Sequence, residues 1–145
     1  MVTDTLKTIL ADSGCTLVLY ESGMLSNVPM DRSNQTDIVG RITQLDQVTL
    51  EVRANAVQER YNPLYIAVMK QVRLEDFADQ NEVLYQELLD ICKEIIVRLI
   101  AAKIFKKVKD VRCTKIRENQ FDANMLGWSM TLDLTPLINV ARIPC

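Results

Sequence analysis

The chain has 145 residues, of which 48% are hydrophobic and 25% charged, and its formal net charge is −2. This length suits one domain, and the composition is typical of a globular protein rather than a disordered or fibrous one. The small net charge argues against a general attraction to nucleic acid. No stretch approaches the roughly 18 apolar residues that span a bilayer, and residues 1–10 lack the apolar run of a secretory leader. We therefore expect a single domain over 1–145 and no membrane partner.

The first elements are a short helix, a strand and a long polar segment. Residues 3–12 predict the helix, with Gly14 as its stop signal. Residues 15–20 are β-branched and apolar, which favours a strand. Residues 21–37 are rich in turn-forming residues and predict a long loop, which in a compact domain is usually functional.

Three further strands are predicted before the chain becomes helical. They cover residues 38–44, 48–53 and 64–74, with a loop over 55–63 between the last two. Apolar and polar residues alternate in the last two of these strands, so we expect each to bury one face. The residues expected to point inward are Val48, Leu50, Val52, Leu64, Ile66 and Val68.

The strongest periodic signal is a helix that begins near Asp79, where Asp79 and Glu82 fit a capping box. Its pattern persists to Val108, which predicts roughly 30 residues and a length of about 45 Å. The apolar stripe comprises Leu84, Leu88, Ile91, Ile95, Leu99 and Ala102.

Two more strands are predicted over 111–118 and 127–134, followed by an irregular tail over 135–145. The complete order indicates an α+β fold. We expect a single, mostly antiparallel sheet with the short N-terminal helix and the long amphipathic helix packed on one face.

The residues that carry most enzyme chemistry are missing. The chain has no histidine and no phosphate-binding glycine motif, and its four cysteines are too far apart in sequence for a typical zinc site. We interpret the cysteines as structural thiols, and we expect no catalytic site, no metal and no cofactor.

Charge is distributed in two blocks on either side of the long helix. Six acidic residues and no basic residue lie between Glu75 and Asp90, whereas seven basic residues lie between Lys103 and Arg117. Complementation of the helix dipole explains part of this pattern. Alternatively, opposite charges at two ends of a subunit favour head-to-tail assembly. The residues predicted to meet across such an interface are Glu75, Asp76, Asp79 and Glu82 on one subunit, and Lys106, Lys107, Lys109 and Arg112 on its neighbour.

Three features together resemble the tail-terminator and head-to-tail joining (neck) ring proteins of tailed bacteriophages. They are the polar loop over 21–37, the helix sequence NEVLYQELLDICKEIIVRLI, and the ending FDANMLGWSMTLDLTPLINVARIPC. The resemblance covers the general layout of most of the chain.

This resemblance implies a structural virion protein that forms a hexameric or dodecameric ring. DNA would pass through the lumen without sequence-specific contact, and portal, adaptor or tail-tube proteins would adjoin the ring. The loop residues Asn27, Pro29, Asp31 and Arg32, and the tail after Pro136, would then dock onto neighbouring rings.

Other functions remain open from the sequence. The chain could be a small cytosolic binding or regulatory module in which Trp128 and Tyr61 line a groove, although an aromatic residue on an alternating strand is more often part of the core. The basic residues over 103–117 could contact phosphates. An enzyme is the least favoured alternative.

Overall fold

The computed structural model describes residues 2–21, 37–43, 49–72, 81–103, 105, 108, 111–118, 124–134 and 140–142. It confirms the α+β class, and its elements up to β6 follow the order expected from the sequence. The elements are α1 (Val2–Asp12), β1 (Leu17–Glu21), β2 (Ile38–Thr43), β3 (Thr49–Arg53), β4 (Ala56–Val72), α3 (Asn81–Ala101), β5 (Arg112–Glu118), β6 (Asn124–Leu134) and β7 (Val140–Arg142).

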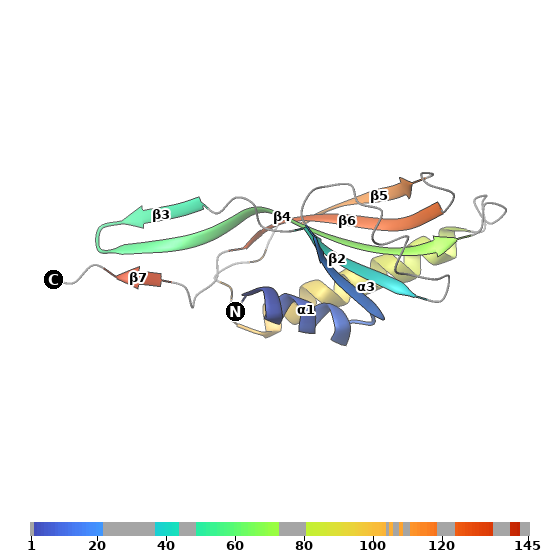
Figure 1. Ribbon diagram of the computed structural model, residues 1–145, viewed down its shortest axis with the longest axis horizontal. Coiled ribbons are helices and arrows are strands. Elements are labelled where there is room, and N and C mark those ends of the chain that lie inside the picture. The colour runs from blue at the N-terminus through green and yellow to red at the C-terminus, as the bar shows by residue number, and fades with distance from the viewer. Residues whose placement is uncertain are drawn as a thin grey trace.

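The sheet has a five-stranded body and a narrow extension that share strand β4 (Figure 1). In the body the strand order is β1-β2-β4-β6-β5, and only the β1–β2 pair is parallel. In the extension, β3 and β7 pair with the first residues of β4. Residues Val140–Arg142 therefore form a strand, which corrects the expectation of an irregular tail at these positions.

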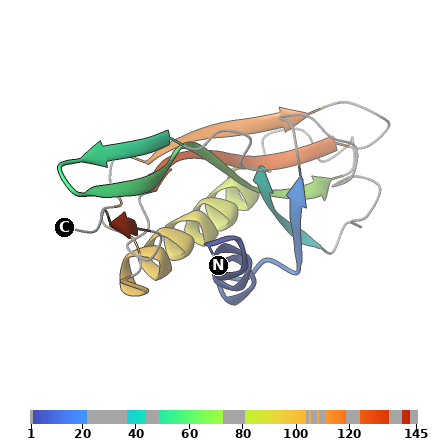
Figure 2. The same cartoon turned by 60° about the vertical axis from the view of Figure 1, so that its left-hand side comes forward.

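Both helices lie on one side of the body, which we call the helix side (Figure 2). Leu6 and Leu10 of α1 and Leu88 and Ile95 of α3 join one buried core with the inward residues of the sheet. The three inward residues predicted in β4 belong to this core and are fully buried: Leu64, Ile66 and Val68. A smaller buried cluster on the far side of the sheet consists of Leu19, Val39 and Met69.

Helix α1 ends as its sequence predicts. Gly14 has φ +116°, a conformation that glycine adopts without steric cost. The Cys15 amide donates to the Leu10 carbonyl at 3.1 Å and the Gly14 amide donates to the Ala11 carbonyl at 3.3 Å. This pair of bonds is a Schellman cap, which satisfies carbonyls at the end of the helix.

Helix α3 is shorter than predicted. It ends at Ala101 and is followed by Lys103 with φ +56°, so the expected continuation to Val108 is wrong. Its 21 residues span about 30 Å rather than 45 Å. Along the predicted stripe Leu88, Ile95 and Leu99 are buried, whereas Ala102 is exposed.

The loop predicted over 55–63 is instead part of β4, which runs without interruption from Ala56 to Val72. Asn62 and Pro63 lie where the β4–β6 register shifts, between Tyr61 and Leu64. Proline cannot donate a ladder hydrogen bond, and bulges are among the few places in a sheet where this is tolerated. The turn of the β3–β4 hairpin is formed by Ala54 and Asn55.

Candidate assembly interface

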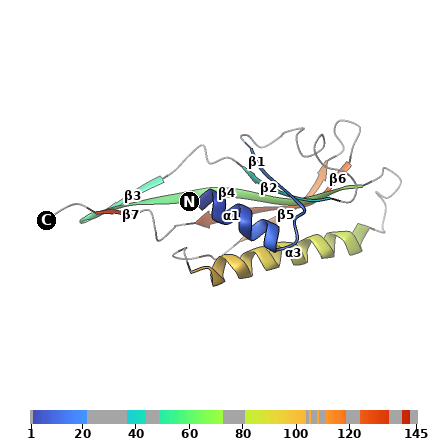
Figure 3. The ribbon, with the colours of Figure 1, turned by 60° about the horizontal axis from the view of Figure 1, so that its bottom comes forward.

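The narrow extension of the sheet projects past the helices (Figure 3). We call residues 49–60, which comprise β3, the Ala54–Asn55 turn and the start of β4, the arm. Every arm side chain that the structure describes is exposed or half-buried. A two-stranded hairpin is marginally stable in water on its own, so the arm depends on its neighbours for order. Within the chain, β7 supplies one such neighbour at the other edge of β4.

The arm presents two large apolar side chains to solvent. Leu50 is 59% exposed and Val52 is 72% exposed. The alternation in this strand predicted that both would be buried, and that prediction is wrong. Alternation places Leu50 and Val52 on the same face, but neither helix extends under the arm to cover that face.

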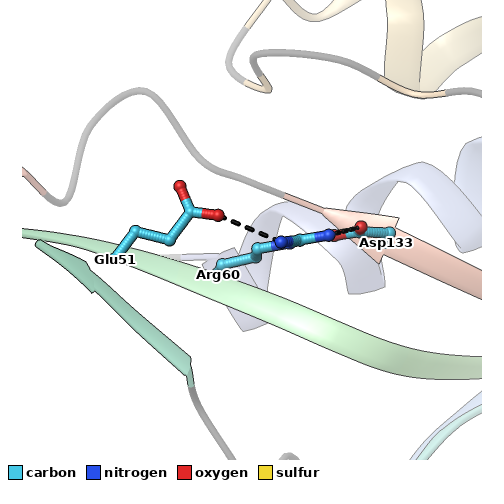
Figure 4. Close-up of polar contacts among 3 residues, drawn as sticks. All are labelled: Glu51, Arg60 and Asp133. Carbon is cyan, nitrogen blue, oxygen red and sulfur yellow. Dashed lines mark hydrogen bonds and ion pairs between the residues drawn. The ribbon is translucent and has the colours of Figure 1, made fainter. Parts of the chain in front are cut away.

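Arg60 joins the arm to the body of the sheet (Figure 4). Its Nε donates to Asp133 Oδ1 at 3.0 Å, its Nη2 donates to Asp133 Oδ2, and its Nη1 donates to Glu51 Oε1 at 3.0 Å. The hydrogen bonds to Asp133 and the charge of Asp133, followed by the contact with Glu51, raise the pKa of Arg60. A guanidinium that bridges two carboxylates from different strands fixes where the arm leaves the body.

These three residues do not stand out in the sequence. The useful signal was the pairing of two alternating segments, 49–53 and 56–60, across the two residues Ala54 and Asn55, which is the usual length of a hairpin loop. In that register Thr49 lies opposite Arg60 and Glu51 lies opposite Gln58. Glu51 and Arg60 are therefore diagonal neighbours on one face.

The irregularity in β4 determines which arm residues lie on the helix side of the sheet. Between its pairs with Leu134 and Leu132, β4 contains one residue more than β6. Leu132 is buried on the helix side, so Tyr61, opposite Leu134, also falls on the helix side by its register position. Positions 57 and 59 share that side with their partners on β3, Val52 and Leu50. The exposed apolar pair of the arm therefore faces the same way as the helices.

The first turns of α3 are held to the sheet by Trp128 and Tyr85. The Trp128 indole donates to the Tyr85 carbonyl at 2.8 Å, and the Tyr85 hydroxyl donates to the Ile116 carbonyl at 3.2 Å. The two rings form an edge-to-face pair with centroids 5.9 Å apart. Trp128 thus packs against the core, which agrees with its interpretation as a core residue rather than part of a groove; the side chain of Tyr61 lies outside the described residues.

The charged blocks are arranged differently from the sequence interpretation. Strand β5 runs back along α3, so Lys115 of the basic block reaches Glu82 of the acidic block within the same chain, with Nζ and Oε1 3.7 Å apart. The Lys115 ammonium also lies 4.6 Å from the Tyr85 ring centroid. The two blocks are therefore not wholly separated at opposite ends of the helix. Arg112 is exposed at the start of β5, opposite Thr131.

The other residues predicted to take part in assembly lie outside the described residues. They are Glu75, Asp76, Asp79, Lys106, Lys107, Lys109, Asn27, Pro29, Asp31 and Arg32. The two ends of the predicted docking loop are described. Next to its second end, the Thr16 amide donates to the Ile38 carbonyl and the Ile38 amide donates to Thr16 Oγ1, both at 2.8 Å. Because β1 and β2 pair in parallel, the loop leaves the body at Glu21, opposite Thr43, and rejoins it beside Thr16, at the other end of the β1–β2 pair.

The described thiols of Cys15 and Cys92 are buried, and that of Cys113 is half-buried. Burial raises the pKa of Cys15 to about 12 and that of Cys92 to about 12, and it also raises the pKa of Cys113. A thiol kept in its protonated form is a poor nucleophile and a poor metal ligand. Over the described part of the chain, no three acidic or cysteine side chains gather as metal ligands would. The same residues include no helix long and apolar enough to cross a bilayer.

Comparison of the chain with protein-family models and with curated proteins gives no match.

Proposed function

We propose that this protein is a structural subunit that assembles with copies of itself into a ring at the neck or tail end of a tailed bacteriophage, through which DNA passes. The observation that carries the proposal is the arm. It extends past the helices, contains no buried side chain among those described, and exposes Leu50 and Val52. Exposed apolar surface on a projecting strand promotes nonspecific association of a monomer. Contact with another molecule removes this surface from water.

The body of the fold suits a repeated structural part. Helix α3 is fastened to the sheet by Trp128 and Tyr85, and the arm is fastened to the body by Arg60. A subunit whose projecting element has a fixed direction can make the same contact with every copy, which a closed ring requires.

Sedimentation velocity over a concentration series, followed by electron microscopy of the assembled species, tests the proposal. We expect a closed hexamer or dodecamer, and we expect the chain among the proteins of purified virions. A chain that sediments as a monomer or dimer at high concentration, and is absent from virions, would instead favour a small cytosolic binding module.

The charged blocks give a second test. Reversing Lys106 and Lys107 to glutamate should weaken assembly, and reversing Asp76 and Asp79 to lysine in the same chain should restore it. Because exposed ion pairs contribute less than about 1 kcal/mol each, an effect requires that the blocks act together. If neither change alters the sedimentation profile, these charges do not form the subunit contact.

A further inference from the structure

Large apolar side chains are exposed in two pairs among the described residues. One pair, the arm patch, is Leu50 and Val52 on β3. The other, the helix-end patch, is Val97 and Ile100 near the end of α3, each 57% exposed. The remaining exposed large apolar residue, Val83, stands alone near the start of α3 and is 67% exposed.

The two patches lie toward the same end of the molecule. The C-terminal end of α3 points toward the arm in all three ribbon views (Figures 1–3). The register places the arm patch on the helix side of the sheet. All four side chains are nevertheless more than half exposed. The two patches therefore do not cover one another within one chain.

Each patch has a charged neighbour, and the two charges are opposite. Glu59 lies directly across from Leu50 in the β3–β4 register, on the same side of the arm. Beside the helix-end patch, Glu94 and Arg98 form an ion pair with each other, with Oε1 and Nε 3.0 Å apart. Lys103 is exposed and follows Ile100 by three residues, just beyond the last turn of α3. An apolar pair flanked by a carboxylate is thus matched by an apolar pair flanked by an ammonium group. Complementary charges at the rim of an apolar contact favour one docking orientation over others.

We propose that the arm patch of one subunit packs on the helix-end patch of a second copy of this chain, with Glu59 facing Lys103 at the rim. This inference rests on the proposed function, because it requires that the chain assembles. The two patches are different surfaces, so the contact is heterologous. Each subunit gives its arm to one neighbour and receives the arm of another, a pattern that closes into a ring when the rotation allows.

A charge placed in either patch tests the contact. Val97→Asp or Leu50→Asp puts a carboxylate into a contact that excludes water, and each should raise the subunit dissociation constant by about tenfold or more. Val83→Asp is the matched control, since it makes the same change on the same helix at a residue outside both patches. Circular dichroism shows whether each variant remains folded, and sedimentation velocity measures assembly.

Cross-linking tests the pairing of the two patches. Cys113 and Cys145 are first replaced by serine, while Cys15 and Cys92 are buried and remain. Two differently tagged chains are then co-expressed, one with Cys at position 50 or 52 and the other with Cys at position 97 or 100. Mild oxidation should join the two tags in one band on a non-reducing gel. The same arm variants paired with Val83→Cys should not give that band.

The outcomes separate this inference from the proposed function. Cross-linking between arm and helix-end cysteines, together with weaker assembly of Val97→Asp than of Val83→Asp, supports both. A ring that forms normally in Val97→Asp and Leu50→Asp, without any arm-to-helix cross-link, overturns the docking contact and leaves the proposed function standing. A wild-type chain that stays monomeric at high concentration overturns both.

Discussion

The Arg60 guanidinium donates two hydrogen bonds to the Asp133 carboxylate, 73 residues further along the chain. Arg60 belongs to the arm and Asp133 belongs to β6 in the body, so this pair crosses the boundary between the two parts of the sheet. Arg60 is 34% exposed and Asp133 is 38% exposed. The pair is therefore a surface interaction that orients the arm, and it is not part of the buried core.

Arg60→Met should loosen the arm without unfolding the body. The methionine side chain preserves much of the apolar packing of arginine but cannot bridge Glu51 and Asp133. Hydrogen exchange of the arm amides should become faster, by less than about tenfold because exposed ion pairs are weak. Arg98→Met is the matched control, since it breaks another exposed pair, with Glu94. Equal exchange of the arm in both variants would show that Arg60 does not hold it.

Gly127→Ala should destabilise the fold severely. A Cβ at Gly127 would clash with the Val68 carbonyl oxygen and lie 2.7 Å from the Met69 Cα, so the backbones of β4 and β6 would have to separate. We expect a loss of about 3 kcal/mol or more in the free energy of unfolding, measured by urea denaturation.

Gly40→Ala is the comparison for Gly127. Its Cβ would meet Cys15 Sγ and Leu10 Cδ2 at 2.8 Å, which are side-chain atoms that can shift. The expected loss is smaller, about 1–2 kcal/mol. If Gly40→Ala destabilises the fold more than Gly127→Ala does, the close approach of β4 and β6 is contradicted.

Trp128→Phe should release the first turns of α3 from the sheet. The change removes the indole donor of the 2.8 Å bond to the Tyr85 carbonyl while keeping an aromatic ring. We expect a loss of about 1–2 kcal/mol in the free energy of unfolding. Unfolding is monitored by circular dichroism, because the substitution removes the single tryptophan of the chain. Tyr85→Phe should cost about 1 kcal/mol through its bond to Ile116. Tyr65→Phe, on the far side of the sheet, serves as control, and a loss as large as that of Trp128→Phe would argue against a specific role for the indole.

Stability should fall at alkaline pH because of the buried thiols. Burial raises the pKa of Cys15 and Cys92 from 9.0 to about 12 in the folded chain. The unfolded chain loses these protons first, so the stabilisation present below pH 9 is lost as the pH rises toward 12. Each thiol contributes a slope of up to about 1.4 kcal/mol per pH unit in this window. Urea denaturation at several pH values should show a shallower decline for a Cys15→Ala/Cys92→Ala variant, and parallel curves would contradict the burial of these thiols.

The periodic parts of the fold could be predicted because burial there follows local spacing. The stripe through Leu88, Ile95 and Leu99 predicts which side of α3 meets the sheet. Gly14 marks the end of α1 because its positive φ favours glycine. The end of α3 could not be located in the same way, since Lys103 adopts a left-handed conformation that is rare for a residue with a side chain.

The arm could not be predicted because two local sequence patterns within and beside it usually indicate other structures. Asn62 and Pro63 are typical of a loop, yet here they occupy an irregularity inside a strand. The alternation through Leu50 and Val52 identifies a shared face, but whether that face is covered depends on how far the helices extend along the sheet, which strand spacing does not encode. For the same reason, the return of Lys115 to Glu82 along β5 could not be deduced from the positions of the charged blocks.

Native mass spectrometry of the purified wild-type chain tests the central claim, self-assembly into a closed ring, most directly. We expect one dominant species at six or twelve times the subunit mass, as the proposed hexameric or dodecameric ring requires. A spectrum that contains only the single subunit at every concentration, under conditions that preserve a known ring of similar size, would contradict the account.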